Sequence, residues 1–433
     1  MRENQKGNNM KNTDHFRTFI DICQKNSTWN KNSLPLCAAE NIISPFSKIP
    51  LDTFLQEKYI MGGILNYNFN NNFIGSHNLY EIYGLINQQC STIFSSIYAD
   101  SRTLSGVNAV TTLLMSLFRA KDTILISGED CGGHSSMPKI CHRLGINTVE
   151  LPYDYDKHDF NYNVANELIH NINPSGILIC LSDMIAVPNI SKFELSEDTI
   201  LIFDATQILG LIAGKIVPNP FNYFSDKQNF ILMGATHKTL PGPTCGLIMT
   251  RNESLARKFD EKINPDFLRN NQLHHILSLS LTLLEMEYYG EEYAKNIVKN
   301  ANLLGSNLAK SKFNMIKLGD IYTQTHQLFI SMPKEKVTTF IERCENNGIT
   351  LNARYKRIYH NSGIRIGTQE ITRYGWGASE MKKISEILTL ISNCKESNSI
   401  IKKEITSLSE KKHINYSFSK KEFDKVYSSL HYH

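Results

Sequence analysis

The sequence predicts an α/β protein with a mostly parallel sheet in a large domain and a smaller α+β domain after it. Three observations support this fold class. The chain has 433 residues, more than one ordinary domain. Hydrophobic residues make up 41% and charged residues 20%, which is a globular composition. Between about residues 85 and 250, short apolar runs alternate with stretches of helical length.

Five apolar runs predict the strands of the large sheet. Each run is short, rich in β-forming residues and apolar throughout, as expected of a strand covered on both faces. The runs are residues 123–126, 176–180, 200–203, 230–233 and 246–249. Helical periods such as 108–119 and 136–143 fall between them, and this alternation is typical of crossover helices that connect parallel strands.

The remaining elements predict the domain boundaries. A long helical pattern at 273–311 leads to a strand, helix, strand, strand and helix at 327–332, 334–346, 349–352, 363–367 and 378–394. The chain begins with polar residues and one short helix at 15–24, and it ends in residues rich in Lys, Ser and Glu. We therefore expect an N-terminal arm, a large domain, a linker helix with a small domain, and a polar tail, at 1–35, 36–275, 276–395 and 396–433.

Composition excludes several classes of protein. Lys and Arg number 46 against 42 Asp and Glu, which is too even for a general nucleic-acid binder. No run approaches the roughly 20 apolar residues of a membrane span, and the first residues lack the apolar segment of a secretory signal. The nine cysteines form no CxxC pair, so we expect neither disulfides nor a metal site, and a cytoplasmic location.

Lys238 is the most informative candidate. It lies in Ala235-Thr236-His237-Lys238-Thr239-Leu240-Pro241-Gly242-Pro243, directly after an apolar strand. An amine at the end of a buried strand is desolvated, which lowers its pKa and suits it to form a Schiff base. Taken alone, the Lys-Thr pair fits a solvated loop better, and the surrounding pattern reverses that preference.

Four further motifs complement Lys238. Asp204 ends the run 200–203, where a buried carboxylate would pair with a protonated pyridine nitrogen or cap the next helix. Leu104-Ser105-Gly106 precedes a helical pattern and would cradle a phosphate or simply cap the helix. A glycine-rich turn, Cys131-Gly132-Gly133-His134, follows a strand. Arg365, between two glycines, would bind a substrate carboxylate or form a surface ion pair. Together these motifs indicate a site for pyridoxal 5'-phosphate and an amino acid.

The same motifs resemble the serine hydroxymethyltransferase family, whose members are fold-type-I pyridoxal-phosphate enzymes. The resemblance runs from about residue 34 to 390. It rests on Leu36-Cys37-Ala38-Ala39-Glu40-Asn41, Leu104-Ser105-Gly106, Gly132-Gly133-His134, Phe203-Asp204-Ala205, Thr236-His237-Lys238-Thr239-Leu240-Pro241-Gly242-Pro243 and Ser362-Gly363-Ile364-Arg365-Ile366-Gly367-Thr368.

The resemblance implies roles for particular residues. It implies that Lys238 forms the Schiff base, that Asp204 holds the ring nitrogen and that Arg365 binds the amino-acid carboxylate. It implies a homodimer in which Tyr59 reaches the partner subunit's site and contacts the substrate. The full set of candidate catalytic residues is Lys238, Asp204, His237, Tyr59 and Glu40; the cofactor-binding set is Ser105, Gly106, Cys131, Asp204, Gln207, Thr236 and Lys238.

Several positions depart from the family pattern. The general acid/base Glu of the family aligns with Met61, which cannot move a proton. The histidine that stacks on the cofactor ring aligns with Cys131. This cysteine would be a smaller ring contact that admits a bulkier substrate, a nucleophile, or a tolerated packing change. The other departures are Ala39, Asn68, Phe69, Val107, Gln207 and Thr244.

These departures favour a folate-independent reaction at Cα, either aldol cleavage or transfer of a β-hydroxy amino acid such as threonine. Glu40, His134, His237 or Tyr59 would supply the base. The alternatives are a divergent folate-dependent hydroxymethyltransferase, another reaction at Cα (racemisation, transamination or decarboxylation), and a non-catalytic binding protein. Retention of Lys238 argues against the last, because a buried amine without a role is costly.

Overall fold

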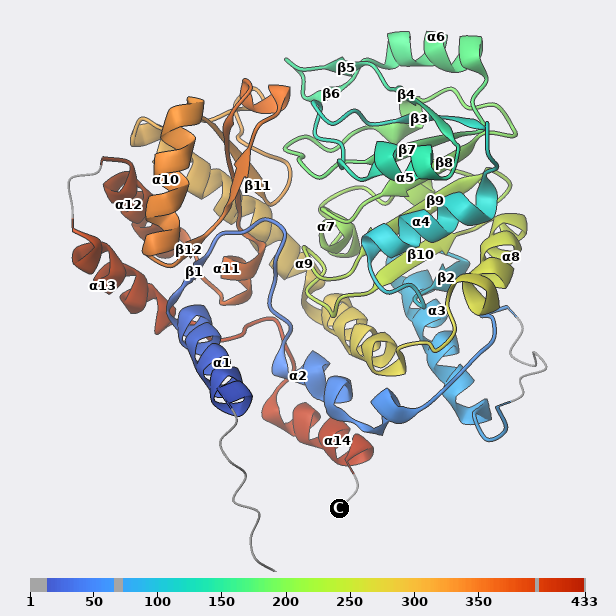
Figure 1. Cartoon of the computed structure of the whole chain (residues 1–433), viewed down its shortest axis with the longest axis horizontal. Helices are drawn as coiled ribbons and strands as arrows, with labels where there is room; N and C mark the ends of the chain where they lie inside the picture. The colour runs from blue at the N-terminus through green and yellow to red at the C-terminus, as the bar shows by residue number, and fades with distance from the viewer. Residues whose placement is uncertain (1–13, 66–72, 394–396, 432–433) are drawn as a thin grey trace, which may run out of the picture.

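The computed structural model describes residues 14–65, 73–393 and 397–431. In Figure 1 the long helix α9 (Leu273–Lys310) runs between a large sheet with its helices and a smaller sheet with α10 and α12. Side chains are buried along the whole length of α9, from Leu273 to Leu308, because it packs against elements of both parts. The expected positions Asn68 and Phe69 and the predicted helix end at residue 394 lie outside the described residues.

The large sheet has seven strands in the order β2-β10-β9-β8-β7-β3-β4. From β9 to β4 all neighbours are parallel, whereas β10 is antiparallel to both β9 and β2, so the predicted mostly parallel sheet is confirmed. The bounds are β2 Tyr98–Asp100, β3 Thr123–Ile126, β4 Asn147–Glu150, β7 Gly176–Cys180, β8 Ile200–Asp204, β9 Phe230–Ala235 and β10 Gly246–Thr250. The edge strands β2 and β4 were not predicted, because short and partly exposed strands carry no apolar run.

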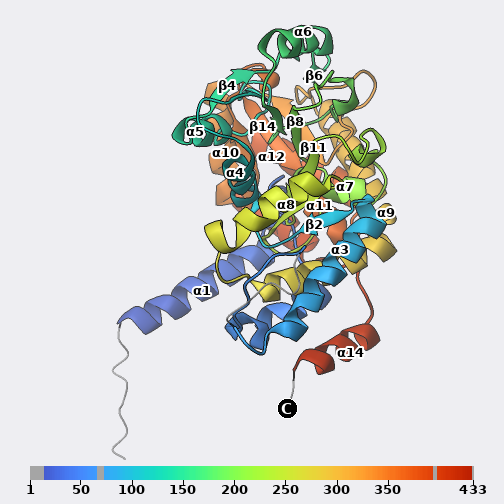
Figure 2. The ribbon, with the colours of Figure 1, turned by 90° about the vertical axis from the view of Figure 1, so that its right-hand side faces the viewer.

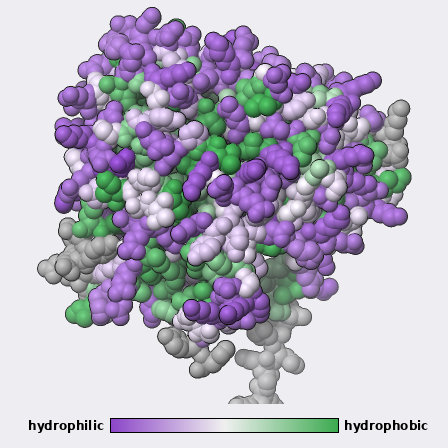
Figure 3. Space-filling model, turned by 180° about the vertical axis from the view of Figure 1, so that it is seen from behind, coloured by the Kyte–Doolittle hydropathy of each residue, from purple (hydrophilic) through white to green (hydrophobic). Residues whose placement is uncertain are grey.

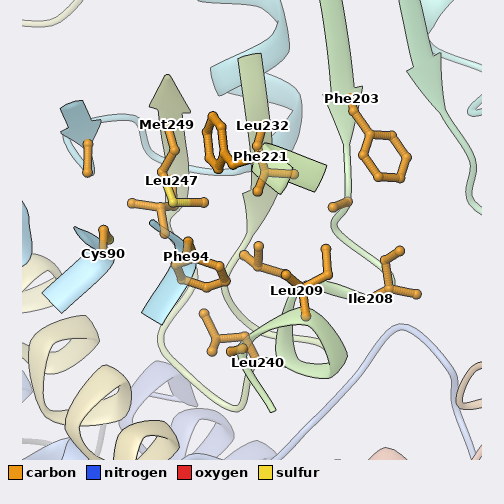
Figure 4. Close-up of a cluster of buried hydrophobic side chains, with 14 of the residues drawn as sticks. Cys90, Phe94, Phe203, Ile208, Leu209, Phe221, Leu232, Leu240, Leu247 and Met249 are labelled. Atoms are coloured by element: carbon orange, nitrogen blue, oxygen red, sulfur yellow. The ribbon is translucent and has the colours of Figure 1, made fainter. Parts of the chain in front are cut away.

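Helices cover both faces of this sheet, as crossover connections require. Figure 4 shows one face of the core, where Phe203, Leu232 and Leu247 from three adjacent strands lie above Phe94 and Leu209 from α3 and α7. The helices of this part are α2 Pro45–Lys48, α3 Glu81–Phe94, α4 Gly106–Leu117, α5 Met137–Arg143, α6 Tyr162–Ile172, α7 Leu209–Ala213 and α8 Glu253–Glu261. A separate hairpin joins β5 Tyr153–Asp154 to β6 Asp159–Phe160.

The smaller part is an α+β unit, as predicted, and the structure shows that its sheet is antiparallel with helices packed on it. Its strand order is β11-β14-β13, and a two-stranded piece pairs β1 with β12 in parallel. The bounds are β1 Leu34–Pro35, β11 Gln327–Ser331, β12 Ile349–Thr350, β13 Asn352–Arg354, β14 Gly363–Gly367, α10 Lys334–Asn346, α11 Gln369–Arg373 and α12 Ala378–Asn393. The pairing of β1 with β12 places Leu34 and Pro35 in this smaller part, far in sequence from its other strands.

The two ends of the chain contain more helix than the sequence predicts. Helix α1 (Asp14–Asn32) extends beyond the expected 15–24 and projects from the body in Figure 2. The expected polar tail contains α13 (Asn398–Ser409) and α14 (Lys420–Leu430). Ile401, Ile405 and Leu408 lie on one face of α13 and are buried, because their helical spacing gives the helix an apolar face. No helix among the described residues is long and apolar enough to cross a membrane.

Candidate active site

The candidate site lies where β7, β8 and β9 end. The register pairs Cys180, the last residue of β7, with Asp204, the last residue of β8, and Asp204 with Met233 of β9. Ligands of open α/β sheets gather at the carboxyl ends of such strands. Three residues beyond the end of β9 stands Lys238, so one edge of the sheet brings the carboxylate and the amine together.

A cavity of about 220 Å³ occupies this edge. Its lining contains six of the predicted site residues, which come from three separate stretches of sequence. The lining residues are Ser105, Gly106, Val107, His134, Cys180, Leu181, Ser182, Asp204, Thr206, Gln207, Ala235, His237 and Lys238. The sequence motifs therefore converge on one enclosed space.

Lys238 is held by its backbone, which leaves its amine to the cavity. The side-chain amide of Asn41 donates to the Lys238 carbonyl and also to the hydroxyl of Tyr293, 2.9 Å away. Burial lowers the pKa of Lys238, and the nearby Arg365 lowers it further, against the opposite effect of Asp204. No hydrogen bond or ion pair holds its Nζ within the described part of the chain. A lowered pKa makes the amine easier to deprotonate and therefore more readily nucleophilic.

Both oxygens of Asp204 accept hydrogen bonds from its neighbours. The backbone N–H of Thr206 donates to Oδ1 at 2.9 Å, and the thiol of Cys180 donates to Oδ2 at 3.0 Å. Burial and the carboxylate of Asp204 raise the pKa of Cys180 well above its ordinary value, so the thiol stays protonated and remains a donor. Cys180 thus fixes the orientation of the carboxylate, a role that the sequence did not reveal.

The N-terminus of α4 forms the other end of the cavity. Ser105 is the N-cap, and its Oγ accepts from the backbone N–H of Asn108 at 3.2 Å. Gly106 packs closely on β9, because a Cβ added there would lie 3.0 Å from the Cβ of Ala235. The helix start therefore presents its backbone N–H groups and its positive dipole end to the cavity, an arrangement that favours phosphate.

Two imidazoles also line the cavity. Burial lowers the pKa of His134, and burial together with Lys238 lowers the pKa of His237 to about 4. Nδ1 of His134 accepts from the backbone N–H of Ser136 at 3.2 Å, so its proton belongs on Nε2. Nδ1 of His237 is buried without a hydrogen-bond partner among the described residues. Both rings are neutral near pH 7, and His237 has a nitrogen free to accept a proton.

Arg365 adjoins the cavity through its wall. It is buried in the middle of β14, and its Nη1 donates to the carbonyl of Ser182, a lining residue, at 2.7 Å. Its Nε and Nη2 donate to Oδ1 of Asn352, its cross-strand partner, at 3.2 and 2.8 Å. The buried Asp183 accepts from Nη1 at 3.2 Å. The Arg365 of the sequence motif is thus a firmly oriented cation beside the cavity.

Gln207 is oriented by a residue that the sequence did not single out. Its Oε1 accepts from Nε2 of Gln327 at 2.9 Å, and the same Nε2 donates to the carbonyl of Ser182 at 3.0 Å. The amide of Gln207 therefore turns its own N–H groups away from Gln327. Thr206 was also missed; its Oγ1 accepts from the backbone N–H of Ala235 at 2.8 Å.

Besides Arg365, four predicted site residues lie outside this cavity lining. Cys131 is 2% exposed, and its thiol donates to the carbonyl of Gly128 at 3.1 Å. The hydroxyl of Thr236 donates to the carbonyl of Pro243 and so holds the loop after Lys238. Glu40 lines a different hollow, and Tyr59 is 38% exposed and stacks on Phe73 with ring centroids 4.3 Å apart. Their predicted roles stay predictions.

The residues at the strand ends fit pyridoxal phosphate. Asp204 would supply a carboxylate for the ring nitrogen, Lys238 an amine for the aldehyde, and the start of α4 N–H donors for the phosphate. The unpartnered Nδ1 of His237 leaves a buried polar atom that a ligand would satisfy. The donor set and its placement therefore match the chemistry of this cofactor.

Comparison with known proteins identifies the class and then the family. The fold is that of fold-type-I pyridoxal-phosphate-dependent transferases: the crystal structure of L-threonine transaldolase from Pseudomonas fluorescens in its internal aldimine state superposes with a TM-score of 0.88, at 19% identity, covering 96% of this chain and 97% of that one. The family model for serine hydroxymethyltransferase matches residues 11–388, so the chain belongs to that family.

Curated relatives agree along nearly the whole chain. Serine hydroxymethyltransferase from Sulfolobus acidocaldarius is 29% identical and covers 96% of this chain and 98% of its own length. The enzyme of the same name from Thermoplasma volcanium is also 29% identical, over 92% of this chain and 95% of its own. The family implies pyridoxal phosphate as cofactor and an amino acid as substrate.

Proposed function

We propose that this chain is a pyridoxal-phosphate enzyme that cleaves or transfers β-hydroxy amino acids such as threonine without folate. The observation that carries the proposal is one cavity that joins Lys238, Asp204 and the neutral His237, beside Arg365. When bound, the cofactor delocalises negative charge that develops at Cα. The P. fluorescens protein of the same fold is an L-threonine transaldolase, which agrees with this reaction type.

Each residue has a defined task in this reaction. Lys238 attaches the cofactor through its amine, and Asp204 keeps the ring nitrogen protonated. Arg365 receives the α-carboxylate of the amino acid. His237 accepts the β-hydroxyl proton while the Cα–Cβ bond breaks and the aldehyde leaves. The electron pair left on Cα then takes up a proton, which gives glycine, or attacks a second aldehyde, which gives a new β-hydroxy amino acid. Because its pKa is about 4, the imidazole is unprotonated throughout the neutral range, and the same low pKa makes it a weak base.

The loss of the family's acid/base Glu supports independence from folate. Met61 occupies the aligned position, and a thioether transfers no proton. Its backbone carbonyl accepts from the hydroxyl of Tyr80, and Met61 is absent from the cavity lining. Among the lining residues the only carboxylate is Asp204, and in the proposed site that carboxylate would bind the ring nitrogen and would not be available as a base.

We also propose a homodimer with shared sites. Phe16, Phe19, Ile20 and Cys23 recur at helical spacing on α1 and are exposed, with Phe19 at 61%. Figure 3 shows hydrophobic residues at the surface over the centre and lower half of the face opposite to that in Figure 1. A second copy would cover such surface and bring its Tyr59 to the cavity.

The test is to mix the purified holoenzyme with threonine, with and without tetrahydrofolate, and to measure glycine and acetaldehyde. We expect both products without folate. A second aldehyde, added in excess, should yield a new β-hydroxy amino acid if transfer competes with release. Lys238→Ala is the matched inactive control. Absence of turnover with several β-hydroxy amino acids would contradict the proposal.

The family relatives favour one alternative, a divergent folate-dependent hydroxymethyltransferase, because the two curated relatives from S. acidocaldarius and T. volcanium both carry that name. Glycine released from serine only when tetrahydrofolate is present would support it. Racemisation, transamination or decarboxylation would appear in the same assays as D-amino acid, keto acid or amine. No observation in the described part of the structure favours these three reactions.

A further inference from the structure

Three cations converge on one buried carboxylate beside the cavity. Asp183 is fully buried, and it accepts from Nε of Arg354 at 2.7 Å, from Nζ of Lys356 at 2.8 Å and from Nη1 of Arg365 at 3.2 Å. The hydroxyl of Tyr359 donates to the same carboxylate at 3.0 Å. The three cations hold the pKa of Asp183 far below its ordinary value, against the opposite effect of burial. The group therefore contains three positive charges against one negative charge.

The local sequence explains this convergence. Asn352 and Arg354 lie two residues apart on β13, so their side chains share one face of the strand, and Asn352 is the cross-strand partner of Arg365. Lys356 continues the alternation just beyond the strand. The spacing of two thus directs both extra cations to the side of the sheet where Arg365 lies.

The cluster adjoins the cavity at two points. Arg365 donates to the carbonyl of Ser182, and Lys356 donates to the carbonyl of Gly133 at 3.0 Å. Ser182 and His134, the residue after Gly133, both line the cavity. Lys356 also acts electrostatically on His134, whose pKa it helps to lower. A substrate bound by Arg365 would therefore lie close to both additional cations.

Arg354 and Lys356 have hydrogen-bonding capacity to spare. Their side chains are 22% and 12% exposed. Arg354 uses Nε on Asp183 and Nη1 on the carbonyl of Ala353, and its Nη2 donates to nothing within the described residues. Lys356 uses two of its three N–H groups. Donors that are partly buried, held in place and still without a partner are suited to bind a ligand.

Charge counting leads to the same conclusion. Asp183 offsets one cation, and the α-carboxylate proposed for Arg365 offsets a second, which leaves one positive charge. Asp130 and Glu150, near Cys131, are exposed and form no ion pair with these cations in the part of the chain that the structure describes. Burying cations in excess is costly unless an anion joins them.

We propose that Arg354 and Lys356 bind a second carboxylate, carried by the β-substituent of the amino acid or by the aldehyde that corresponds to it. This inference rests on the proposed function, because it assumes that Arg365 holds the α-carboxylate. It assigns the site to β-hydroxy amino acids with an acidic side group rather than to threonine itself. The guanidinium and the ammonium are anchored on the same aspartate, and both are cations that bind carboxylates.

The experiment compares the holoenzyme's affinity for 3-hydroxyaspartate and for threonine, which differ by a carboxylate in place of a methyl group. Binding is measured twice, as a change in cofactor absorbance and as a shift in Tm. We expect 3-hydroxyaspartate to bind at least about tenfold tighter than threonine. Arg354→Gln and Lys356→Gln should each reduce this ratio about fivefold, while Asp183 retains its other partners.

Arg357→Gln is the matched control. It removes the same charge one residue after Lys356, but this exposed guanidinium lies over the ring of Tyr155, 4.0 Å from its centroid. We expect no change in the ratio. Equal affinities in the wild type, or an equal loss in the control, would overturn the inference.

The outcomes separate this inference from the proposed function. Tighter binding of 3-hydroxyaspartate without aldol turnover would uphold the second carboxylate site and contradict the reaction. Folate-free cleavage of threonine, with equal affinity for the two ligands, would uphold the reaction and contradict the site.

Discussion

The strand-end wall of the cavity and the segment around Tyr59 differ in how far their side chains are buried and bonded within a single chain. At the wall, Asp204 is 7% exposed and both of its oxygens are hydrogen-bonded within the chain. In the segment, Phe54, Tyr59 and Phe73 are 40%, 38% and 40% exposed. A single chain therefore fixes the side chains on the side of the site proposed for the cofactor. The aromatic side remains open surface that a second copy would complete.

The segment is nevertheless well anchored at its base. Arg102 is fully buried, pairs with Asp100 and Asp260, and donates to the carbonyl of Gly62 at 2.9 Å. Asp260 in turn accepts from the backbone N–H of Ile64 at 2.8 Å. The ion pairs therefore fix where the segment leaves the body, while its aromatic side chains stay exposed.

The largest effect is expected from a substitution at the strand-end wall of the cavity. Lys238→Ala removes the amine that we propose attaches the cofactor, so we expect a fall in turnover of about a thousandfold or more. The protein should lose the absorbance change that borohydride causes in the wild type. If the variant kept both the absorbance change and the turnover, the cofactor would be attached at another residue, and the proposed role of the strand-end wall would be contradicted.

The second prediction tests whether the segment around Tyr59 contributes to the site of a second subunit. Tyr59→Phe and Lys238→Ala are each expected to be nearly inactive as homodimers. Mixed in equal amounts and allowed to exchange subunits, they should recover about a quarter of the wild-type activity, because half of the dimers have one intact site. Activity that does not recover on mixing, or a monomer by light scattering, would contradict the shared site.

The third prediction concerns acid stability. Burial lowers the pKa of His237 to about 4 and that of His326 to about 3, both below the ordinary 6.5. Between these values the unfolded chain binds protons that the folded chain excludes, so the free energy of unfolding falls as the pH drops below about 6.5. Each imidazole should contribute a loss of about 2 kcal/mol by about pH 5.

Urea unfolding at neutral pH and at about pH 5 measures this loss. His326→Gln removes one of the two imidazoles, and it should reduce the acid-induced loss by about 2 kcal/mol. An identical pH dependence in wild type and variant would show that His326 is not a buried neutral ring.

A smaller effect is expected from Cys180→Ala. The variant removes the thiol that donates to Asp204, while the backbone N–H of Thr206 still holds the other oxygen. Losing one such bond costs about 1 kcal/mol, which corresponds to about a fivefold lower kcat. Cys180→Ser, which keeps a donor, should recover most of the rate. A rate loss in both variants alike would indicate a packing role instead.

The smallest effect is expected at Cys131. Its thiol donates to the carbonyl of Gly128 and does not line the cavity, so Cys131→Ala should change kcat by less than about twofold. Steady-state kinetics with the best substrate measures this. A larger change in kcat would support the predicted contact of Cys131 with the cofactor ring.

Local patterns in the sequence were enough to predict the buried strands and the motifs on them. The predicted strands at 123–126 and 176–180 coincide with β3 and β7, because a strand covered on both faces must be apolar along its length. Lys238 and Asp204 were recognised for the same reason: a charged residue at the end of such a strand contrasts with its surroundings.

Only the tertiary structure decided which distant residues support that site. Cys180 meets Asp204 through strand register, and Gln327 meets Gln207 across the two parts of the molecule. Asp183 forms ion pairs with Arg354, Lys356 and Arg365, which lie about 170 to 180 residues away in sequence. Single polar residues carry no periodic signal, since their significance depends on which partners the folded chain places within hydrogen-bond distance. The sequence by itself thus determined the sheet and the chemistry at its edge, and the packing of the two parts determined how that chemistry is oriented and charged.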